Sequence, residues 1–396
     1  MVKILLLVPE YLPGFKAGGA LRSTVNMIDR LGGEFDFKIL TSDRDEGDQN
    51  SYKNVVLNEW NSVGNVSVYY LPPEDRSISN VTNIIKNTQH DILYLNSCFD
   101  LPFTIYPLIS RKLGMIPKKP VVIATRGEFS KSALNIKKWK KICFMYIAHI
   151  LALYKNINWQ ASSDFEANDI KKALSKDNLK ISVAPNIPKY LKPSIFQGSI
   201  SSPKTLKSFK ICFLGRVSPV KNLDFALNVL SRLSIEIEFD IYGPASKDED
   251  KKYWNYCMKI IEQIPSNIKV KYKGPIENHL VNDMFKKYNL FFFPTKGENF
   301  GHVILESMSA GTPPLIANTT PWRNLDKQNA GWDIALNSPH KFVSVIEKIA
   351  LLDEGKYKDL RNSVRNYAEK FANNDSILES SRQLFMNALE DVDVQK

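Results

Sequence analysis

The strongest constraint on the fold is an alternation of short apolar runs with amphipathic helical stretches, which occurs twice along the chain. Between residues 187 and 208, prolines and serines without any period interrupt this rhythm, and it restarts at residue 209. Alternating strands and helices predict a parallel sheet with helices on both faces. Two such series, in a chain of 396 residues, predict two Rossmann-like α/β domains that face each other across a cleft.

The boundaries follow from the same rhythm. We expect a first domain over residues 1–190, a linker over 191–208, a second domain over 209–370 and a final helical segment over 371–396 that packs back on the first domain, since no strand follows it. Strands are expected at 3–9, 35–42, 66–72, 91–97, 120–128, 157–163, 180–186, 209–217, 236–244, 268–274, 289–295 and 312–318. Helices are expected at 18–33, 80–89, 222–233, 251–264, 279–288, 302–310 and 377–389.

Charge and cysteine content narrow the class of protein. The formal net charge of +11 favours an anionic partner, which could be nucleotide phosphates, an acidic membrane surface or nucleic acid. The four cysteines, which are widely spaced, predict reduced core residues of a cytosolic protein rather than a disulfide framework or a metal site: Cys98, Cys143, Cys212 and Cys257. The apolar start is too short for a signal peptide and predicts a buried strand, and no apolar stretch is long enough to span a membrane.

A pair of cations follows the first strand of the second domain. This strand ends at Gly215, Arg216 comes next, and Lys221 precedes a helix that begins near Asn222. Arginine binds phosphates bidentately, and a helix N-terminus attracts anions, so this loop suits a diphosphate. The alternative is that both cations are ordinary solvated side chains.

Two glycines precede the first helix of the first domain. Gly18 and Gly19 can bring the backbone very close to a ligand and expose its N–H groups. The dinucleotide pattern Gly-x-Gly-x-x-Gly is absent. The alternative is an ordinary strand-to-helix loop.

The segment "KGENFGHVILESMSAGTPP" carries two glutamates with seven residues between them. Glu298 lies in the loop after a predicted strand, Gly301 turns the chain into a helix, and Glu306 lies on that helix. Carboxylates accept hydrogen bonds from sugar hydroxyls and from a ribose diol. The loop residues Asn299 and Phe300 belong to the same candidate site. The alternative is a capping glutamate followed by a solvated helix face.

These motifs together resemble those of family 4 of the retaining glycosyltransferases, the glycosyl transferases group 1, which have the GT-B architecture. The two glutamates, the Gly215-Arg216 and Lys221-Asn222 motif and the glycine loop occur in the order that the family shows, and the resemblance covers nearly the whole chain. The segment 319–325, "TTPWRNL", is similar to a variant in bacterial surface-polysaccharide enzymes of the family.

The resemblance implies a role for each motif. Arg216 and Lys221 would neutralise the diphosphate leaving group, and Glu306 would bind the nucleotide ribose. Glu298 would hold the transferred sugar together with the backbone N–H groups of Phe300 and Gly301. Gly18 and Gly19 would close over the phosphates from the first domain. The resemblance also implies that no metal and no cofactor are needed, because the cations take the place of a metal.

One position departs from the family pattern. Many relatives carry a histidine at the end of a first-domain strand, whereas Arg126 and Glu128 occupy that place here and none of the five histidines does. Arg126 could supply a cation to the donor sugar, or it could be a structural ion-pair partner of Glu128.

The segment Lys137–Tyr154 combines lysines with a tryptophan and an apolar run. Basic and aromatic residues together favour docking on an anionic membrane. The apolar residues cover all sides of a helix, however, which is typical of a buried helix.

We therefore expect a retaining, metal-independent glycosyltransferase that moves a sugar from a UDP- or GDP-sugar to a glycan acceptor on a polyprenol carrier. Surface polysaccharide biosynthesis (O-antigen, capsule or exopolysaccharide) would be its setting, in the cytoplasm and peripherally on the inner face of the cytoplasmic membrane. A nucleotide-sugar epimerase of the same fold is one alternative. A nucleic-acid-binding protein is another, but the lysines are spread along the chain instead of forming a continuous basic face.

Overall fold

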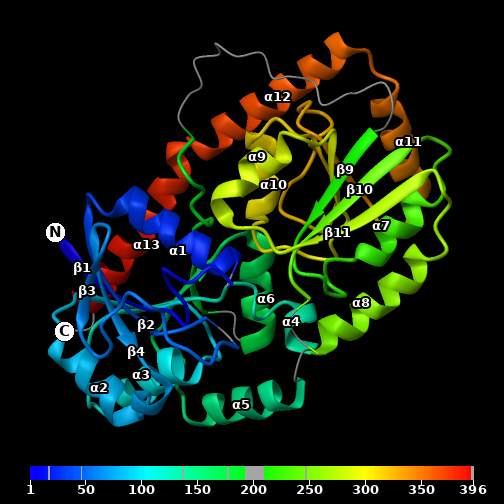
Figure 1. Cartoon of the computed structure of the whole chain (residues 1–396). Helices are drawn as coiled ribbons and strands as arrows, with labels where there is room; N and C mark the ends of the chain where they lie inside the picture. Colours follow the sequence, from blue (N-terminus) through cyan, green and yellow to red (C-terminus); the bar gives the residue numbers. More distant parts are fainter. Residues whose placement is uncertain are drawn as a thin grey trace. The chain divides into compact units, whose positions relative to one another are not determined.

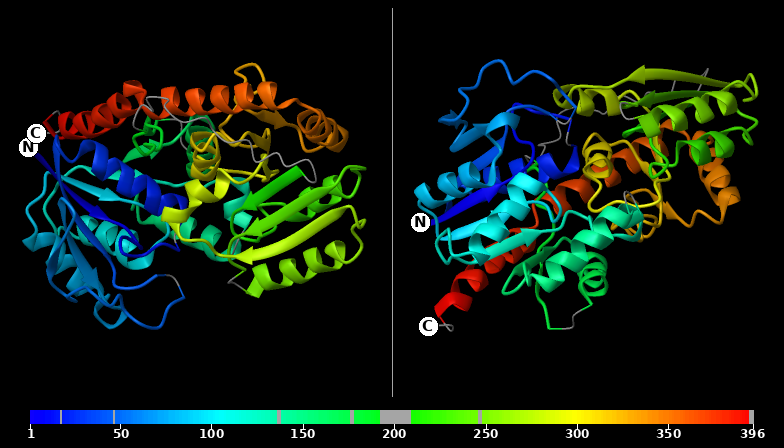
Figure 2. Two further views of the ribbon diagram at one scale, coloured as in Figure 1. Left: turned by 45° about the horizontal axis from the view of Figure 1, so that its top comes forward. Right: turned by 90° about the horizontal axis from the view of Figure 1, so that it is seen from below.

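The computed structural model describes residues 1–16, 18–45, 47–135, 138–175, 178–191, 209–245 and 248–393. The chain forms two compact units. Unit 1 comprises Met1–Tyr190 and Asn374–Lys396, and unit 2 comprises Leu191–Asn373. Both ends of the chain therefore belong to unit 1 (Figure 2). Apart from Leu191, the predicted linker lies outside the described residues.

Unit 1 is built on an eight-stranded sheet with the order β3-β4-β2-β1-β5-β6-β7-β8 (Figure 1). Neighbouring strands are parallel except for the antiparallel pair β3 and β4. Central strands such as β1 and β5 are continuous apolar runs because both faces of a parallel sheet are covered. The strands are β1 (Val2–Leu7), β2 (Phe35–Ser42), β3 (Trp60–Val63), β4 (Val66–Leu71), β5 (Ile92–Leu95), β6 (Val121–Ala124), β7 (Asn158–Ala161) and β8 (Lys180–Val183).

The last helix of the chain, α13, packs on the sheet of unit 1, where it contacts β5, β6 and β8. The ring of Phe385 lies 5.2 Å from that of Phe35, and Arg382 donates two hydrogen bonds of 2.7 Å to Glu34. This confirms the predicted return of the last helix to the first domain. The helices of unit 1 are α1 (Gly19–Leu31), α2 (Ile78–Asn87), α3 (Tyr106–Lys112), α4 (Lys131–Asn135), α5 (Lys138–Ile150), α6 (Asp164–Leu174) and α13 (Asp375–Asp393), with the short turns η1 (Pro73–Asp75) and η2 (Leu101–Ile105).

Unit 2 has a six-stranded, fully parallel sheet with the order β11-β10-β9-β12-β13-β14. Helices α7 and α8 cover one side of it, and α9 and α10 cover the other (Figure 1). The strands are β9 (Phe209–Leu214), β10 (Ile237–Tyr242), β11 (Ile268–Gly274), β12 (Leu290–Phe293), β13 (Pro314–Ala317) and β14 (Trp332–Ile334). The helices are α7 (Leu223–Leu230), α8 (Asp248–Ile261), α9 (Val281–Phe285) after the turn η3 (Asn278–Leu280), α10 (His302–Ser309), α11 (Pro339–Ala350) and α12 (Glu354–Ala372).

Each sheet has a point where the strand order reverses, and this point locates the candidate site. In unit 1 it lies between β1 and β5, and in unit 2 it lies between β9 and β12. Ligands of open α/β sheets bind outside the carboxyl ends of the strands at such a point. In unit 2 the residues concerned are therefore those that follow Leu214 and Phe293.

Candidate functional site

Two loops of unit 2 are joined at the reversal of the strand order. The backbone N–H of Lys296 donates to the carbonyl of Val220 at 2.7 Å, and the Thr295 hydroxyl donates to the same carbonyl at 3.1 Å. Asn222 immediately precedes α7 and has left-handed backbone angles, and its side-chain amide donates to the carbonyl of Pro294 at 2.9 Å. The loop after β9 is therefore fixed against the loop after β12.

This connection brings Lys221 and Glu298 into an ion pair between the Lys221 Nζ and the Glu298 Oε1. The pair is mostly buried, because the Lys221 side chain is 22% exposed and that of Glu298 is 14% exposed. The Lys221 Nζ also lies 5.4 Å from the centroid of the Phe293 ring. The sequence assigned the two residues separate roles and did not predict their contact.

Arg216 lies on the same loop as Lys221, and its side chain is 45% exposed. Its Nε is 3.6 Å from the Oδ2 of Asp250, a buried residue in the first turn of α8. The two predicted diphosphate cations therefore lie on one loop at the carboxyl end of β9. Asp250 was not among the predicted site residues, since neither its spacing nor its sequence context indicates a contact with Arg216.

The loop ahead of α10 owes its shape to Gly301, which has a φ of +78°. A side chain there would place its Cβ 2.8 Å from the Ile304 Cδ1. Phe300 is buried, and its ring lies 5.7 Å from that of Trp322, whose indole N–H donates to the Phe300 carbonyl at 2.6 Å. The side chain of Phe300 therefore belongs to the core. The predicted contact of Phe300 with a ligand would be made by its backbone N–H group. Trp322 gives the segment 319–325 a structural role.

The remaining predicted residues of unit 2 lie on the same segment. Asn299 is half-buried in the loop, and Glu306 is half-buried on α10. The predicted contacts of both residues with a ligand stay predictions.

In unit 1, Gly18 precedes α1 with a φ of +63°, and Gly19 is the first residue of the helix. A Cβ at Gly18 would meet no atom within 4 Å, so the backbone conformation, not crowding, favours glycine. The predicted closure of these glycines over phosphates stays a prediction.

Arg126 follows β6 and is held by neutral partners. Its Nε donates to the Asn96 Oδ1 at 2.5 Å, its Nη2 donates to the Tyr94 hydroxyl at 3.0 Å, and its Nη1 donates to Asn186. Glu128 instead accepts hydrogen bonds from Ser97 and from the Cys98 backbone. Among the described residues, Arg126 and Glu128 thus form no ion pair, so that alternative is wrong.

The environment of Glu128 also affects its protonation. Burial raises the pKa of the Glu128 carboxyl, and its hydrogen bonds from Cys98 and Ser97 oppose this shift. Arg126 itself lies beside the strand-order reversal of unit 1, because Asn96 follows β5. Its proposed contact with a donor sugar stays a prediction.

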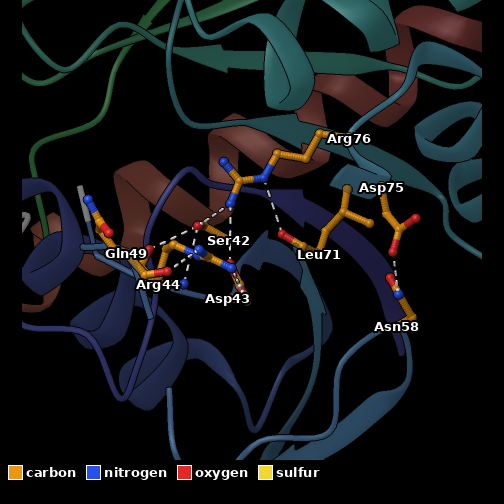
Figure 3. A network of polar contacts seen from close by, with 8 residues as sticks. All are labelled: Ser42, Asp43, Arg44, Gln49, Asn58, Leu71, Asp75 and Arg76. Carbon is orange, nitrogen blue, oxygen red and sulfur yellow. Dashed lines mark hydrogen bonds and ion pairs between the residues drawn. The ribbon is translucent and has the colours of Figure 1, made fainter. Parts of the chain in front are cut away.

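The segment after β2 contains an Asp-x-Asp pattern, Asp43-Arg44-Asp45, which sequence reasoning overlooked. Such a pattern could hold a divalent cation. The Asp43 carboxylate is buried and accepts hydrogen bonds of 2.8 and 2.7 Å from Arg44 and a longer one from Arg76 (Figure 3). Asp45 accepts hydrogen bonds from the Phe15 backbone and from a tyrosine hydroxyl. These carboxylates therefore stabilise the loop after β2.

Among the described residues, no group of three or more histidine, cysteine, aspartate or glutamate side chains is arranged so that it could hold a metal ion. No helix in this described part of the chain has the length and apolar character needed to cross a membrane. Metal independence itself stays a prediction.

Helix α5 is the main feature of the segment Lys137–Tyr154, and it is not a buried helix. One of its faces carries large apolar side chains that are exposed, with Trp139 at 78% and Ile150 at 62%. Within the helix only Ala148 is buried. The interpretation of this segment as a core helix is therefore wrong. Cys143 lies on the exposed face, so the prediction that all four cysteines are core residues is also wrong for this one.

Comparison with solved structures identifies the architecture. HepE of Anabaena, crystallised in complex with UDP and glucose, superposes with a TM-score of 0.70 at 14% identity, over 98% of this chain and 99% of that chain. The lipopolysaccharide outer core galactosyltransferase WaaB superposes with a TM-score of 0.61 at 15% identity, with 98% and 99% covered. Two parallel-sheet units with a last helix that returns to the first unit thus form a GT-B fold, as predicted.

Sequence comparison adds a similarity at the level of the family. Residues 199–371 match the model of the glycosyl transferases group 1. An uncharacterized 41.2 kDa protein in the cps region of Klebsiella pneumoniae is 27% identical over 253 residues. That alignment covers 61% of this chain and 66% of the relative, slightly less than two thirds of its length.

Proposed function

We propose that this protein transfers a sugar from a UDP- or GDP-sugar to a hydroxyl group of a glycan acceptor, with retention of the anomeric configuration. The contact that carries the proposal is the Lys221–Glu298 ion pair at the reversal of the strand order in unit 2. The cation that we propose for the diphosphate therefore lies beside the carboxylate that we propose for the sugar hydroxyls. The solved HepE complex, which contains UDP and glucose, supports a nucleotide sugar as the donor.

Each proposed role rests on the chemistry of the side chain. Arg216 and Lys221 stabilise the negative charge that develops on the leaving nucleoside diphosphate, an effect that is strong in a partly desolvated site. Glu298 and the backbone N–H groups of Phe300 and Gly301 hold the transferred sugar. Glu306 accepts hydrogen bonds from the ribose. No metal is needed when two cations and a helix N-terminus bind the diphosphate.

A thermal-shift panel of nucleoside diphosphates and nucleotide sugars tests the donor class. A ligand that binds only the folded protein raises its melting temperature, so we expect UDP or GDP and one matching nucleotide sugar to do so. Glu306→Gln should then weaken both the free diphosphate and the sugar nucleotide, because both contain the ribose. A panel in which no nucleotide raises the melting temperature would overturn the proposed function.

The acceptor is proposed to be a growing surface glycan on a polyprenol carrier, as in capsule, O-antigen or exopolysaccharide assembly. The relative from a cps region and the structural similarity to WaaB support this setting. An epimerase would need no acceptor, so release of nucleoside diphosphate that depends on an added acceptor favours the transferase. The match to the glycosyl transferases group 1 also favours the transferase over a nucleic-acid-binding protein.

We further propose that α5 docks unit 1 on the inner face of the cytoplasmic membrane. Its outer face carries Trp139, Ile142, Tyr146, Ile147 and Ile150, which are all exposed and recur with the period of one helix face. Tryptophan and tyrosine favour the membrane interface.

Charge and neighbouring residues extend this surface. Lys138 and Lys140 are exposed at the start of the helix and complement anionic lipids. Lys112, the last residue of α3, donates to the carbonyl of Leu151, which directly follows α5. The neighbouring Leu113 is exposed, so the apolar surface of α5 continues onto the loop after α3.

Vesicle co-sedimentation tests the docking. The chain should bind phosphatidylglycerol vesicles and bind phosphatidylcholine vesicles much less. The double variant Trp139→Ser and Ile147→Glu should lose this binding while its melting temperature is kept. Leu351→Glu is the matched control, since Leu351 is 82% exposed but lies in unit 2. Equal binding by the control and the double variant would contradict the assignment to α5.

A further inference from the structure

Asp250, which contacts Arg216, lies in an unusual environment for an aspartate. The Asp250 side chain is only 6% exposed, and its Oδ2 has no hydrogen-bond partner among the described residues. The nearest cation is Arg216, whose Nε lies 3.6 Å from that oxygen. A buried carboxylate is costly to desolvate unless it is paired, so this pairing needs an explanation beyond the stability of the fold.

Backbone hydrogen bonds join the loop that carries Arg216 to the end of β10. The Gly215 N–H donates to the Tyr242 carbonyl at 3.0 Å, and the Val217 N–H donates to the Pro244 carbonyl at 3.0 Å. Gly243 has a φ of +132°, and a Cβ there would lie 1.9 Å from the Gly215 carbonyl oxygen. The loop that leads from β10 toward α8 is therefore in close contact with the loop that carries Arg216.

The geometry leaves one edge of the guanidinium available. Asp250 faces Nε, while the two terminal nitrogens of Arg216 have no hydrogen-bond partner among the described residues. Those terminal nitrogens are the pair that can bind two phosphate oxygens in parallel. A guanidinium anchored at Nε also loses less conformational freedom when a ligand binds.

We propose that Asp250 is a positioning residue that anchors Arg216 through Nε and presents its terminal nitrogens to the diphosphate of the donor. This inference rests on the proposed function, and it adds a residue that none of the site motifs contains. Asp250 does not touch the donor in this proposal. It acts through the orientation of Arg216.

The test is the affinity of Asp250→Asn for UDP and GDP, measured by calorimetry. Asparagine has the shape of aspartate but no charge. Removal of a carboxylate near the site also removes repulsion toward the phosphates, which by itself would tighten binding. A loss of affinity must therefore come from the lost anchor, and we expect the variant to bind the diphosphate about 10-fold more weakly. Equal or tighter binding overturns the proposal.

Two further measurements separate positioning from a general structural role. The corresponding nucleoside, uridine or guanosine, should bind Asp250→Asn as it binds the wild type, because it has no phosphates. In an Arg216→Ala background, Asp250→Asn should weaken diphosphate binding no further. A weaker nucleoside complex, or an additional loss in the double variant, contradicts action through Arg216.

Asp240→Asn is the matched control. Asp240 lies on β10 and forms a comparable ion pair with Lys273, with the two atoms 3.5 Å apart. We expect it to leave diphosphate affinity unchanged, and an equal loss in this variant overturns the specific role of Asp250. If neither UDP nor GDP binds the wild type, or if Arg216→Ala binds them normally, the proposed function is what fails.

Discussion

The ion pair between Lys221 and Glu298 leads to a prediction that runs against the usual effect of removing a site residue. Glu298 forms an ion pair with the Lys221 ammonium, and both side chains are mostly buried. A diphosphate must compete with this carboxylate for the lysine. Glu298→Gln removes the competing charge and keeps the shape of the side chain, so it should make the nucleoside diphosphate bind more tightly.

The size of the effect follows from the contact that is lost. A hydrogen bond to a charged group contributes about 1.5–3 kcal/mol, which limits the gain to roughly 10- to 150-fold in the dissociation constant. Solvent screens the pair in part, so a gain of about 3- to 30-fold is expected. Sugar transfer should nevertheless become slower, because Glu298 is also proposed to hold the hydroxyls of the transferred sugar.

Calorimetry with UDP and GDP measures the affinity, and steady-state turnover with the matching nucleotide sugar measures the transfer. Glu277→Gln is the control, since Glu277 is an exposed glutamate of unit 2 whose side chain forms an ion pair with the exposed His279. It should change neither quantity. If Glu298→Gln weakens the diphosphate complex, Glu298 does not compete for Lys221, and the reasoning is refuted.

Three other predictions concern the cations, the metal and the pH. Arg216→Ala or Lys221→Ala should lower turnover by about 10²-fold or more with an unchanged circular dichroism spectrum, and near-normal kinetics in both would remove them from the site. Transfer should persist in EDTA, and a loss that Mg²⁺ or Mn²⁺ restores would contradict metal independence. Burial lowers the pKa of His90 below 6.5, so the unfolded chain binds more protons just below that pH. Unit 1 should then lose stability as the pH falls below 6.5. The urea midpoint should depend less on pH in His90→Gln, and an equal dependence would refute this cause.

Much of the fold could be predicted because buried parallel strands leave a plain signal in the sequence. Each predicted strand is present, and β2 and β11 begin and end at the predicted residues. The edge strands β3 and β14 were missed, since they are short and only partly buried. Helix α5 was ambiguous because apolar residues lie on all its sides, and only the structure distinguishes its exposed face from its packed face.

The residues of the candidate site that come directly after a strand could be predicted from the sequence. Arg216, Lys221 and Glu298 could be placed at carboxyl ends of strands because the strands themselves were clear. Their partners could not, since a contact between residues 77 positions apart, such as Lys221 and Glu298, depends on how two loops join. The hydrogen bonds of Lys296 and Thr295 to Val220 create that contact.

The same limit applies to Asp250, and it shows what the structure adds to the motifs. A motif identifies which charges meet the ligand, but the orientation of those charges depends on residues that carry no motif. In unit 2 each proposed diphosphate cation has a different carboxylate: Lys221 has Glu298, and Arg216 has Asp250. The first carboxylate is itself proposed to bind the sugar, so it should compete with the ligand. The second is buried away from solvent and should only orient its partner. The two substitutions to the uncharged amide should therefore shift diphosphate affinity in opposite directions, although each removes one negative charge next to one cation.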